Sequence, residues 1–269
     1  MNWWESILLG LIQGLTEFLP VSSSGHLVLG KHVLGLSTGE DVLFEVMVHF
    51  GTIMSVFWVY RTRIIRLTIG CLKAAPRIQD YGRSWKENAE FRMGGQVVIT
   101  MLPVMLAYFL WGEQIVATFS EPQFAAGMLF VTGTLLLLVR LRPSTSGDIT
   151  PGKSLVIGIA QAAAMFPGIS RSGATICAGI YQGVDREKAA DFSFLILLPV
   201  VLGATVLKVG DAVSGVAQAD WGILILATVV AFVSGIWAIR LVLGAVRKGH
   251  LGWFAVYCFV AGGIGLYLL

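Results

Sequence analysis

The sequence predicts an all-α polytopic membrane protein, with six transmembrane helices and two re-entrant half-helix pairs in an inverted repeat. Apolar residues make up 56% of the 269 residues and charged residues 13%, far from the averages of soluble domains. Six apolar stretches are long enough to cross a hydrocarbon core of roughly 30 Å, which takes about 20 helical residues. Two further apolar regions are interrupted by polar residues. We therefore expect a single integral membrane domain over residues 1–269.

The apolar stretches define the predicted elements in chain order. Regions 3–36 and 154–182 fail the length test, because the first breaks at Pro20 and the serines after it and the second breaks at FPGISRSGAT. Each half is too short to span, so each region is interpreted as two half-helices that enter and return on one side. The predicted spans are 42–60, 92–111, 122–140, 189–207, 221–239 and 251–269.

The two interrupted regions indicate an internal duplication. The stretch QGLTEFLPVSSSG begins at Gln13, and QAAAMFPGISRSG begins 148 residues later at Gln161. Each copy, 1–140 and 154–269, is expected to hold one re-entrant pair and three spans, and an odd number of crossings forces the second copy to be inverted. Inverted repeats with broken helices at matching positions indicate a binding site at the membrane midplane.

The distribution of basic residues predicts the orientation. Of the 19 Lys and Arg residues, this topology places 16 on one side and two, Lys31 and Lys208, on the other. Loops rich in Lys and Arg face the cytoplasm, so we expect both termini to face outwards. The remaining basic residue is Arg171, inside the second interruption.

The composition excludes several other classes. The net charge of +3 is a small remainder of 19 basic and 16 acidic residues, so it implies no polybasic surface and no nucleic-acid partner. The three widely spaced cysteines, Cys71, Cys177 and Cys258, suggest neither a disulfide framework nor a metal site. We expect them to be small core residues. The N-terminal run shows no basic leader or cleavage site, so no removable segment is expected.

One charge of each sign lies within the interruptions. A charge at membrane depth costs about 2.5–3.5 kcal/mol on insertion scales, and it therefore indicates a function. Glu17 and Arg171 would meet if the two re-entrant loops touch at the midplane. The alternative is a purely structural ion pair, which leaves the surrounding hydroxyl groups unexplained.

Hydroxyl groups cluster in both interruptions. Helix N-termini present free N–H groups and about half a positive charge each, so two facing N-termini form an anion site. Arg171 adds a planar fork that suits phosphate oxygens, which favours a phosphorylated ligand. For Ser or Gly taken alone, close helix packing is the alternative. The hydroxyl residues are Ser22, Ser23 and Ser24 in the first interruption and Ser170 and Ser172 in the second.

The spacing of the polar residues suggests catalytic roles. Gln13 and Glu17 are four apart on one helical face, and Ser23 and His26 are three apart on the next half-helix if Ser22 caps it. A serine within reach of a base is the minimal nucleophile arrangement. Ser23 is therefore the candidate nucleophile and His26 the candidate proton carrier. A lone intramembrane His can instead be a hydrogen-bonded packing residue, and this alternative stays open.

The charge balance predicts a divalent cation. Arg171 and two helix ends supply about +2 and Glu17 subtracts one, which leaves roughly +1 to face a phosphate or diphosphate of about −2 to −3. Glu17 is the expected ligand, and oxygen donors suit Mg²⁺ or Ca²⁺. Glu45 and His49, four apart, open the next helix and are candidates to support the same cavity. A merely structural hydrogen bond is the alternative for this pair.

Three stretches, QGLTEFLPVSSSGH, the FEV of residues 44–46, and PGISRSGAT, resemble the signatures of the bacterial undecaprenyl-diphosphate phosphatase family, also called the bacitracin-resistance family. The resemblance covers essentially the whole chain. It implies ten helices, six of them spanning, in a bacterial plasma membrane, and a cavity open to the periplasm. It also implies removal of the terminal phosphate of a prenyl diphosphate lipid, with a divalent metal, to recycle the carrier of cell-wall sugars.

The resemblance also assigns residues by position. It places the acidic, metal-binding motif on Gln13 and Glu17, although many members have a second glutamate where this chain has Gln13, so a two-carboxylate clamp is not assumed. It places the catalytic serine and histidine on Ser23 and His26. We favour Ser23 as the nucleophile, with Glu17 holding metal or assisting proton transfer. The phosphate-binding motif falls on Ser170, Arg171, Ser172, Gly173 and Thr175, beside Ser22.

Two other functions remain alternatives. A prenyl-phosphate flippase or transporter would share the inverted repeat and the same midplane anion site. A lipid phosphatase of the acid-phosphatase superfamily needs a second Arg in the site, whereas this topology buries one. A purely structural protein gives no use for Arg171. The sequence leaves open the preferred prenyl length, whether the chain forms a homodimer, and whether it also flips lipid.

Overall fold

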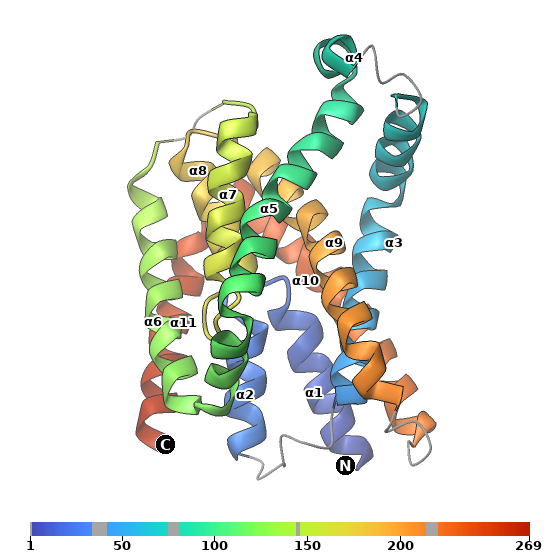
Figure 1. Ribbon diagram of the computed structural model, residues 1–269. Helices are drawn as coiled ribbons and strands as arrows, with labels where there is room; N and C mark the ends of the chain where they lie inside the picture. Colours follow the sequence, from blue (N-terminus) through green and yellow to red (C-terminus); the bar gives the residue numbers. More distant parts are fainter. Residues whose placement is uncertain (1, 34–41, 75–80, 144–145, 214–219) are drawn as a thin grey trace.

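The computed structural model describes residues 2–33, 42–74, 81–143, 146–213 and 220–269 (Figure 1). Within these ranges every regular element is a helix, and one isolated β-bridge joins Gly147 to Val184. The elements are α1 (Trp3–Thr16), α2 (Ser23–Val33), α3 (Val42–Ala74), α4 (Tyr81–Glu87), α5 (Ala89–Ala117), η2 (Thr118–Ser120), α6 (Pro122–Leu138), η3 (Val139–Leu141), α7 (Pro151–Ala163), α8 (Arg171–Tyr181), α9 (Arg186–Val213), α10 (Trp221–Arg247) and α11 (Leu251–Leu268).

Six membrane-length apolar helices confirm the predicted class in the described part of the chain. They are α3, α5, α6, α9, α10 and α11, and each overlaps one predicted span, although α6 and α11 end two residues and one residue short of it. Helices α3 and α5 extend past the predicted limits, to Ala74 and back to Ala89, and the short helix α4 lies between them in sequence. Hydropathy marks only the apolar part of a helix, whereas the Arg and Lys residues in these extensions are good helix formers. The multi-pass prediction is therefore correct, and the helix lengths were underestimated.

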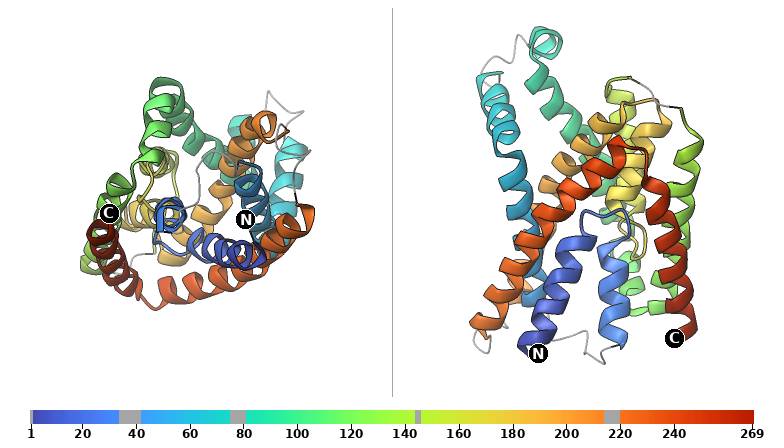
Figure 2. Two further views of the ribbon diagram at one scale, coloured as in Figure 1. Left: turned by 90° about the horizontal axis from the view of Figure 1, so that it is seen from below. Right: turned by 180° about the vertical axis from the view of Figure 1, so that it is seen from behind.

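The two interrupted regions form two pairs of short helices, α1 with α2 and α7 with α8. The four helices have 14, 11, 13 and 11 residues, or about 16–21 Å at 1.5 Å per residue, which is too short for a core of roughly 30 Å. Figure 2 shows α1 and α2 side by side, with the turn between them near mid-height in the molecule. The predicted breaks are therefore true helix ends.

Glycines at matching positions allow one helix of each pair to pack closely on a spanning helix. A Cβ atom added to Gly10 of α1 would lie 2.7 Å from the carbonyl oxygen of Ala227 in α10. A Cβ atom added to Gly158 of α7 would lie 2.7 Å from the carbonyl oxygen of Thr100 in α5. Small residues commonly permit such backbone approach between membrane helices. These two contacts fix each pair against the bundle.

The main apolar core cluster includes Phe18 and Val21 of the α1–α2 turn. Phe18 of this turn is fully buried, and its ring packs edge-to-face on Phe194 of α9 at 5.8 Å between centroids. Cys177 and Cys258 are buried and free, as expected for small core residues. Cys71 is also free but only partly buried, because it lies in the polar extension of α3. Both termini lie at one end of the molecule, opposite α4 (Figure 1).

Candidate active site

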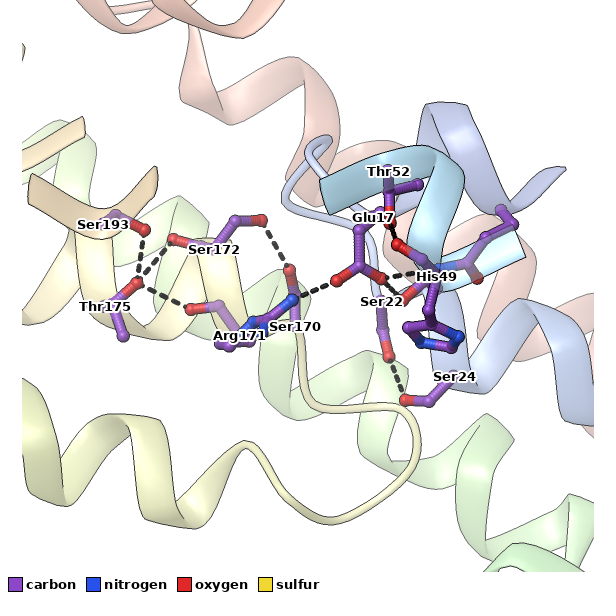
Figure 3. A network of polar contacts seen from close by, with 12 residues as sticks. Glu17, Ser22, Ser24, His49, Thr52, Ser170, Arg171, Ser172, Thr175 and Ser193 are labelled. Atoms are coloured by element: carbon purple, nitrogen blue, oxygen red, sulfur yellow. Dashed lines mark hydrogen bonds and ion pairs between the residues drawn. The ribbon is translucent and has the colours of Figure 1, made fainter. Parts of the chain in front are cut away.

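The turns of the two helix pairs meet inside the molecule. The α1–α2 turn covers residues 17–22 and the α7–α8 turn residues 164–170. A Cβ atom on Gly25 would lie 3.0 Å from the Cα atom of Gly168 in the other turn. Arg171, the first residue of α8, forms an ion pair with Glu17, the C-cap of α1 (Figure 3). The structure therefore joins the two charges that were predicted to meet.

Glu17 accepts hydrogen bonds from both parts of the site. The residue is only 5% exposed. Its Oε1 atom pairs with Arg171, whereas Oε2 accepts from the Ser23 hydroxyl at 2.6 Å and from the Gln13 amide at 3.0 Å. A hydroxyl that donates to a carboxylate at this distance makes a short, charge-assisted hydrogen bond. The candidate nucleophile thus already points its proton at a base.

The two turns repeat one capping arrangement. Ser22 accepts a hydrogen bond from the Gly25 N–H at 3.3 Å, and Ser170 accepts one from the Gly173 N–H at 3.1 Å. In each turn the capping hydroxyl lies 3.2 Å from the hydroxyl of the serine two residues later. The prediction that Ser22 caps its half-helix is confirmed. Both N-termini therefore bring partial positive charge to the meeting point of the turns.

The backbone of Ser22 is unusual for a residue with a side chain. Its φ angle is +71°, in the left-handed region that residues other than glycine seldom occupy. Such a conformation persists only where the surrounding structure holds it. Ser22 is 2% exposed, and its carbonyl oxygen and hydroxyl both take part in hydrogen bonds. The α1–α2 turn is therefore held in one conformation by local contacts.

A cavity of about 200 Å³ lies beside the ion pair. Its polar lining comes from the two turns and the helices that follow or precede them, and from α3. Its apolar lining comes largely from α5, η2 and α9. The polar residues include Glu17, Ser22, Ser23, Ser24, Glu45, His49, Gln161, Ser170 and Arg171, and the apolar residues include Val104, Phe119, Val200, Val201 and Ala204.

Three residues of the predicted phosphate-binding motif do not line this cavity: Ser172, Gly173 and Thr175. The Thr175 hydroxyl donates to the Arg171 carbonyl oxygen at 2.8 Å and lies 2.6 Å from the Ser193 hydroxyl (Figure 3). Ser172 donates to a backbone carbonyl of the α1–α2 turn at 3.2 Å. These side chains hold the start of α8 in place, and Ser170 and Arg171 are the members of the motif that reach the cavity.

The two candidate histidines differ in where they lie. The Nδ1 atom of His26 contacts the Ser22 carbonyl oxygen at 2.7 Å, and its Nε2 atom contacts the Tyr257 hydroxyl at 2.8 Å. The His26 and Tyr257 rings also stack, with centroids 5.5 Å apart. His26 is not among the residues that line the cavity, whereas His49 is. The structure therefore places His49 at the cavity, and His26, the predicted proton carrier, points towards α11.

His49 has one ring nitrogen fixed by the backbone. Its Nδ1 atom lies 2.8 Å from the Glu45 carbonyl oxygen, which can only accept, so Nδ1 carries the proton in the neutral ring. This tautomer leaves the Nε2 lone pair as the basic position. Glu17 and His49 also interact electrostatically. His49 is thus the described imidazole best placed to exchange a proton at the cavity.

Of the two predicted metal ligands, Glu17 lines the cavity and Gln13 does not. The Oε1 atom of Gln13 is buried without a hydrogen-bond partner among the described residues, and its amide nitrogen is held by Glu17. Glu45 adds a second carboxylate at the cavity. No group of three His, Cys, Asp or Glu residues that could hold a metal ion occurs within the described ranges. Carboxylate and amide oxygens are the kind of ligand that Mg²⁺ and Ca²⁺ take in proteins.

Known proteins resemble this chain over almost its whole length. The family model described as bacitracin resistance protein BacA matches residues 6–264. A curated protein of Salinibacter ruber named undecaprenyl-diphosphatase is 50% identical, with both chains fully covered. Proteins of the same name from Desulfatibacillum aliphaticivorans and Christiangramia forsetii are each 39% identical, over 97% of this chain and 97% and 96% of their own lengths. This chain therefore belongs to the bacitracin resistance protein BacA family.

Proposed function

We propose that this protein hydrolyses undecaprenyl diphosphate to undecaprenyl phosphate and inorganic phosphate. The relatives described above carry the name of this activity. The observation that carries the proposal is the convergence of Ser23 and Arg171 on one carboxylate, Glu17, at a cavity with polar and apolar linings. A nucleophile, a proton acceptor and a phosphate clamp therefore occupy one site.

The cavity suits the head group of a lipid. Its volume of about 200 Å³ is below the roughly 300–1,000 Å³ of sites that enclose a drug-sized ligand. The diphosphate therefore fits inside, and the prenyl chain leaves along the apolar residues of α5 and α9. Both of these helices contain an internal proline, Pro103 and Pro199, directly before cavity residues Val104 and Val200. A proline at such a position removes one backbone hydrogen bond and favours a kink.

Arg171 is the residue that recognises the diphosphate. Without substrate its guanidinium pairs with Glu17, and a phosphate oxygen competes for the same planar donor. The N-termini of α2 and α8 add N–H groups and partial positive charge at the same place. Phosphoryl transfer chiefly needs alignment and charge neutralisation, and these groups supply both.

Ser23 attacks the terminal phosphorus. Its hydroxyl proton passes to Glu17, which already accepts it at 2.6 Å, while the bond from that phosphorus to the bridging oxygen breaks and undecaprenyl phosphate leaves. Water then attacks the phosphoserine while Glu17 returns its proton to the departing Ser23 oxygen, which restores the Ser23 hydroxyl and the Glu17 carboxylate and releases inorganic phosphate as H2PO4⁻. His49 exchanges protons at the cavity through Nε2, and His26 positions Ser22 through its carbonyl oxygen.

The same site suits a divalent cation. Glu17 and Glu45 are the carboxylates at the cavity that would hold Mg²⁺ or Ca²⁺, and Gln13, which is fully buried outside the cavity lining, would support Glu17 through its amide. When bound, the cation would neutralise phosphate charge beyond what Arg171 supplies. Activity is expected to disappear with EDTA and to return with the added metal.

We also propose that each helix pair is re-entrant and that the two halves of the chain form an inverted repeat. Supporting observations are the matched serine caps and the matched glycine contacts at Gly10 and Gly158. Both termini lie opposite α4 and the polar extensions of α3 and α5 (Figure 1). We infer that both termini and the cavity face the outside of the bacterial plasma membrane, because basic segments stay in the cytoplasm.

Transport of the lipid remains a distinct mechanism, but the comparisons do not support it. The relatives described above are named as diphosphatases, and the serine–carboxylate hydrogen bond is a feature that transport alone does not need. Lipid binding without phosphate release by the purified protein would favour the flippase.

Phosphate release by detergent-purified protein is the decisive test. Undecaprenyl and farnesyl diphosphates are compared as substrates, each with and without EDTA. We expect release by the wild type, its loss in Ser23→Ala and Arg171→Ala, and partial activity in Arg171→Lys, which keeps the charge but not the fork. Wild-type protein with metal that binds the lipid but releases no phosphate would overturn the proposal.

A further inference from the structure

Gln161 is a buried amide for which the described residues offer no hydrogen-bond partner. It lies in α7, two residues before the helix ends, and is 2% exposed. Neither its Oε1 nor its Nε2 atom has a partner, although a glutamine side chain carries two N–H donors and an acceptor oxygen. Buried polar groups in native proteins are almost always paired. An unpaired one at a cavity therefore points to a ligand.

The environment of Gln161 favours an anionic ligand. It lines the same cavity as Ser170 and Arg171, where two helix N-termini and a guanidinium already favour an anion. A neutral amide N–H can donate to phosphate oxygens without adding charge. The diphosphate is the acceptor-rich part of the proposed substrate, whereas the prenyl chain offers no acceptor.

The matching residue of the first helix pair explains why Gln161 is unpaired. Gln13 lies 148 residues earlier and donates its Nε2–H to Glu17 at 3.0 Å. The residue that matches Glu17 in the second pair is Met165, which cannot accept such a bond. Gln13 therefore donates to the Glu17 carboxylate, whereas the N–H groups of Gln161 remain available for the substrate.

We propose that Gln161 contacts the substrate directly, its Nε2–H donating to an oxygen of the diphosphate. This inference rests on the proposed function, because it takes undecaprenyl diphosphate as the ligand of the cavity. Arg171 then supplies the charge and Gln161 a second, neutral donor from the neighbouring helix of the same pair. Two donors from α7 and α8 orient the diphosphate better than one cation alone.

Gln161→Met and Gln161→Glu test this role, with Gln96→Met as the matched control. Gln96 is also buried, at 3% exposure, but its amide donates to the Ile149 carbonyl oxygen at 2.8 Å. We expect Gln161→Met to raise KM for undecaprenyl diphosphate roughly tenfold, with no loss of melting temperature, because it removes an unpaired buried amide. Gln161→Glu should raise KM further, since a carboxylate replaces the donor beside the phosphates. Gln96→Met should instead lower the melting temperature and leave KM unchanged.

Binding measured in a Ser23→Ala background separates this inference from the proposed function. Undecaprenyl diphosphate should bind Ser23→Ala more tightly than Ser23→Ala/Gln161→Met, even if the wild type proves not to hydrolyse it. Equal affinities of these two proteins, or a KM of Gln161→Met equal to that of the wild type, would overturn the inference. A Gln161→Glu variant that keeps the wild-type KM and depends more strongly on metal would show that residue 161 lies at the cation. This outcome would also overturn the inference.

Discussion

The two helix pairs share a backbone arrangement and divide the chemistry between them. Ser23 and Arg171 are equivalent positions, because each is the first residue of its second helix and directly follows the capping serine. Glu17, by contrast, matches Met165. The first pair therefore carries the Ser23 hydroxyl and the Glu17 carboxylate, and the second pair carries the Arg171 guanidinium. The comparison teaches that the site is complete only where the two turns meet.

The pairs also differ in how deeply they are buried. Eight of the 11 residues of α8 are buried, whereas α2 is mostly half-buried in its described positions. The Thr175 and Ser193 hydroxyls, 2.6 Å apart, hold the start of α8 against α9. The second pair thus anchors the helix that begins with Arg171, while Arg171 itself stays part-buried at the cavity.

Removing the Ser23 hydroxyl from the first pair should have the largest effect on turnover. We expect Ser23→Ala to lower kcat by at least about 10³-fold, because no other group replaces the nucleophile. Ser6→Ala is the matched control. Ser6 belongs to the same pair, and its hydroxyl donates only to the Ile223 carbonyl oxygen, at 2.9 Å. Phosphate release at saturating substrate measures the effect, and substantial turnover by Ser23→Ala would assign the attack to water or to another residue.

Glu17→Gln sharpens the comparison, because Glu17 both accepts the Ser23 proton and competes with substrate for Arg171. We expect kcat to fall by about 10²-fold or more through loss of the base. The Kd for undecaprenyl diphosphate in the Ser23→Ala background should also fall, because the guanidinium no longer has a carboxylate partner. Thermal stability without ligand should decrease, since a part-buried charge loses its partner. Weaker lipid binding would mean that Glu17 contributes more to substrate binding, through the cation that it is proposed to hold, than it takes away by competing with phosphate for Arg171.

The six spans, the two helix breaks and the meeting of the two charges could be predicted from the sequence for physical reasons. The spans follow from apolar length, and the Glu17–Arg171 meeting follows from the cost of isolated charges at membrane depth. The end of α3 at Ala74 did not follow, because hydropathy does not register a helix that continues in polar sequence. The short helix α4 has no apolar pattern to predict it.

The side chains that reach the cavity were harder to predict. His26 and His49 both lie near catalytic residues in sequence, but the direction of His26 depends on Tyr257, which lies 231 residues away. In the sequence, Gln161 stands out only as the first residue of the second repeated stretch. The signal for a role was its correspondence to Gln13 combined with Met165 in place of a glutamate, which predicts an amide without its intrahelical partner.

Replacing each histidine in turn tests which one transfers protons at the cavity. We expect His49→Gln to lower kcat roughly tenfold to a hundredfold, within the range of a lost proton-transfer group. His26→Gln should have a smaller effect on kcat and reduce thermal stability, because His26 contacts the Ser22 carbonyl oxygen and the Tyr257 hydroxyl. Tyr257→Phe removes only the second of these contacts and should resemble a weaker His26→Gln. The reverse order of kcat values would return the proton-carrier role to His26, as the family resemblance implied.

The smallest expected effects concern the packing that the two pairs share. Gly10→Ala and Gly158→Ala should each lower the free energy of unfolding by about 1–3 kcal/mol, because the new methyl group meets a backbone carbonyl at 2.7 Å in both cases. Gly30→Ala in α2 is the control. No described atom lies within 4 Å of its added Cβ, so alanine there should stabilise the helix by roughly 0.5–1 kcal/mol. Matching losses at Gly10 and Gly158, measured by thermal unfolding in detergent, would indicate that the two pairs are seated alike. A loss at one site alone would show that only one of the two glycine contacts anchors its helix pair, and would weaken the case for an inverted repeat.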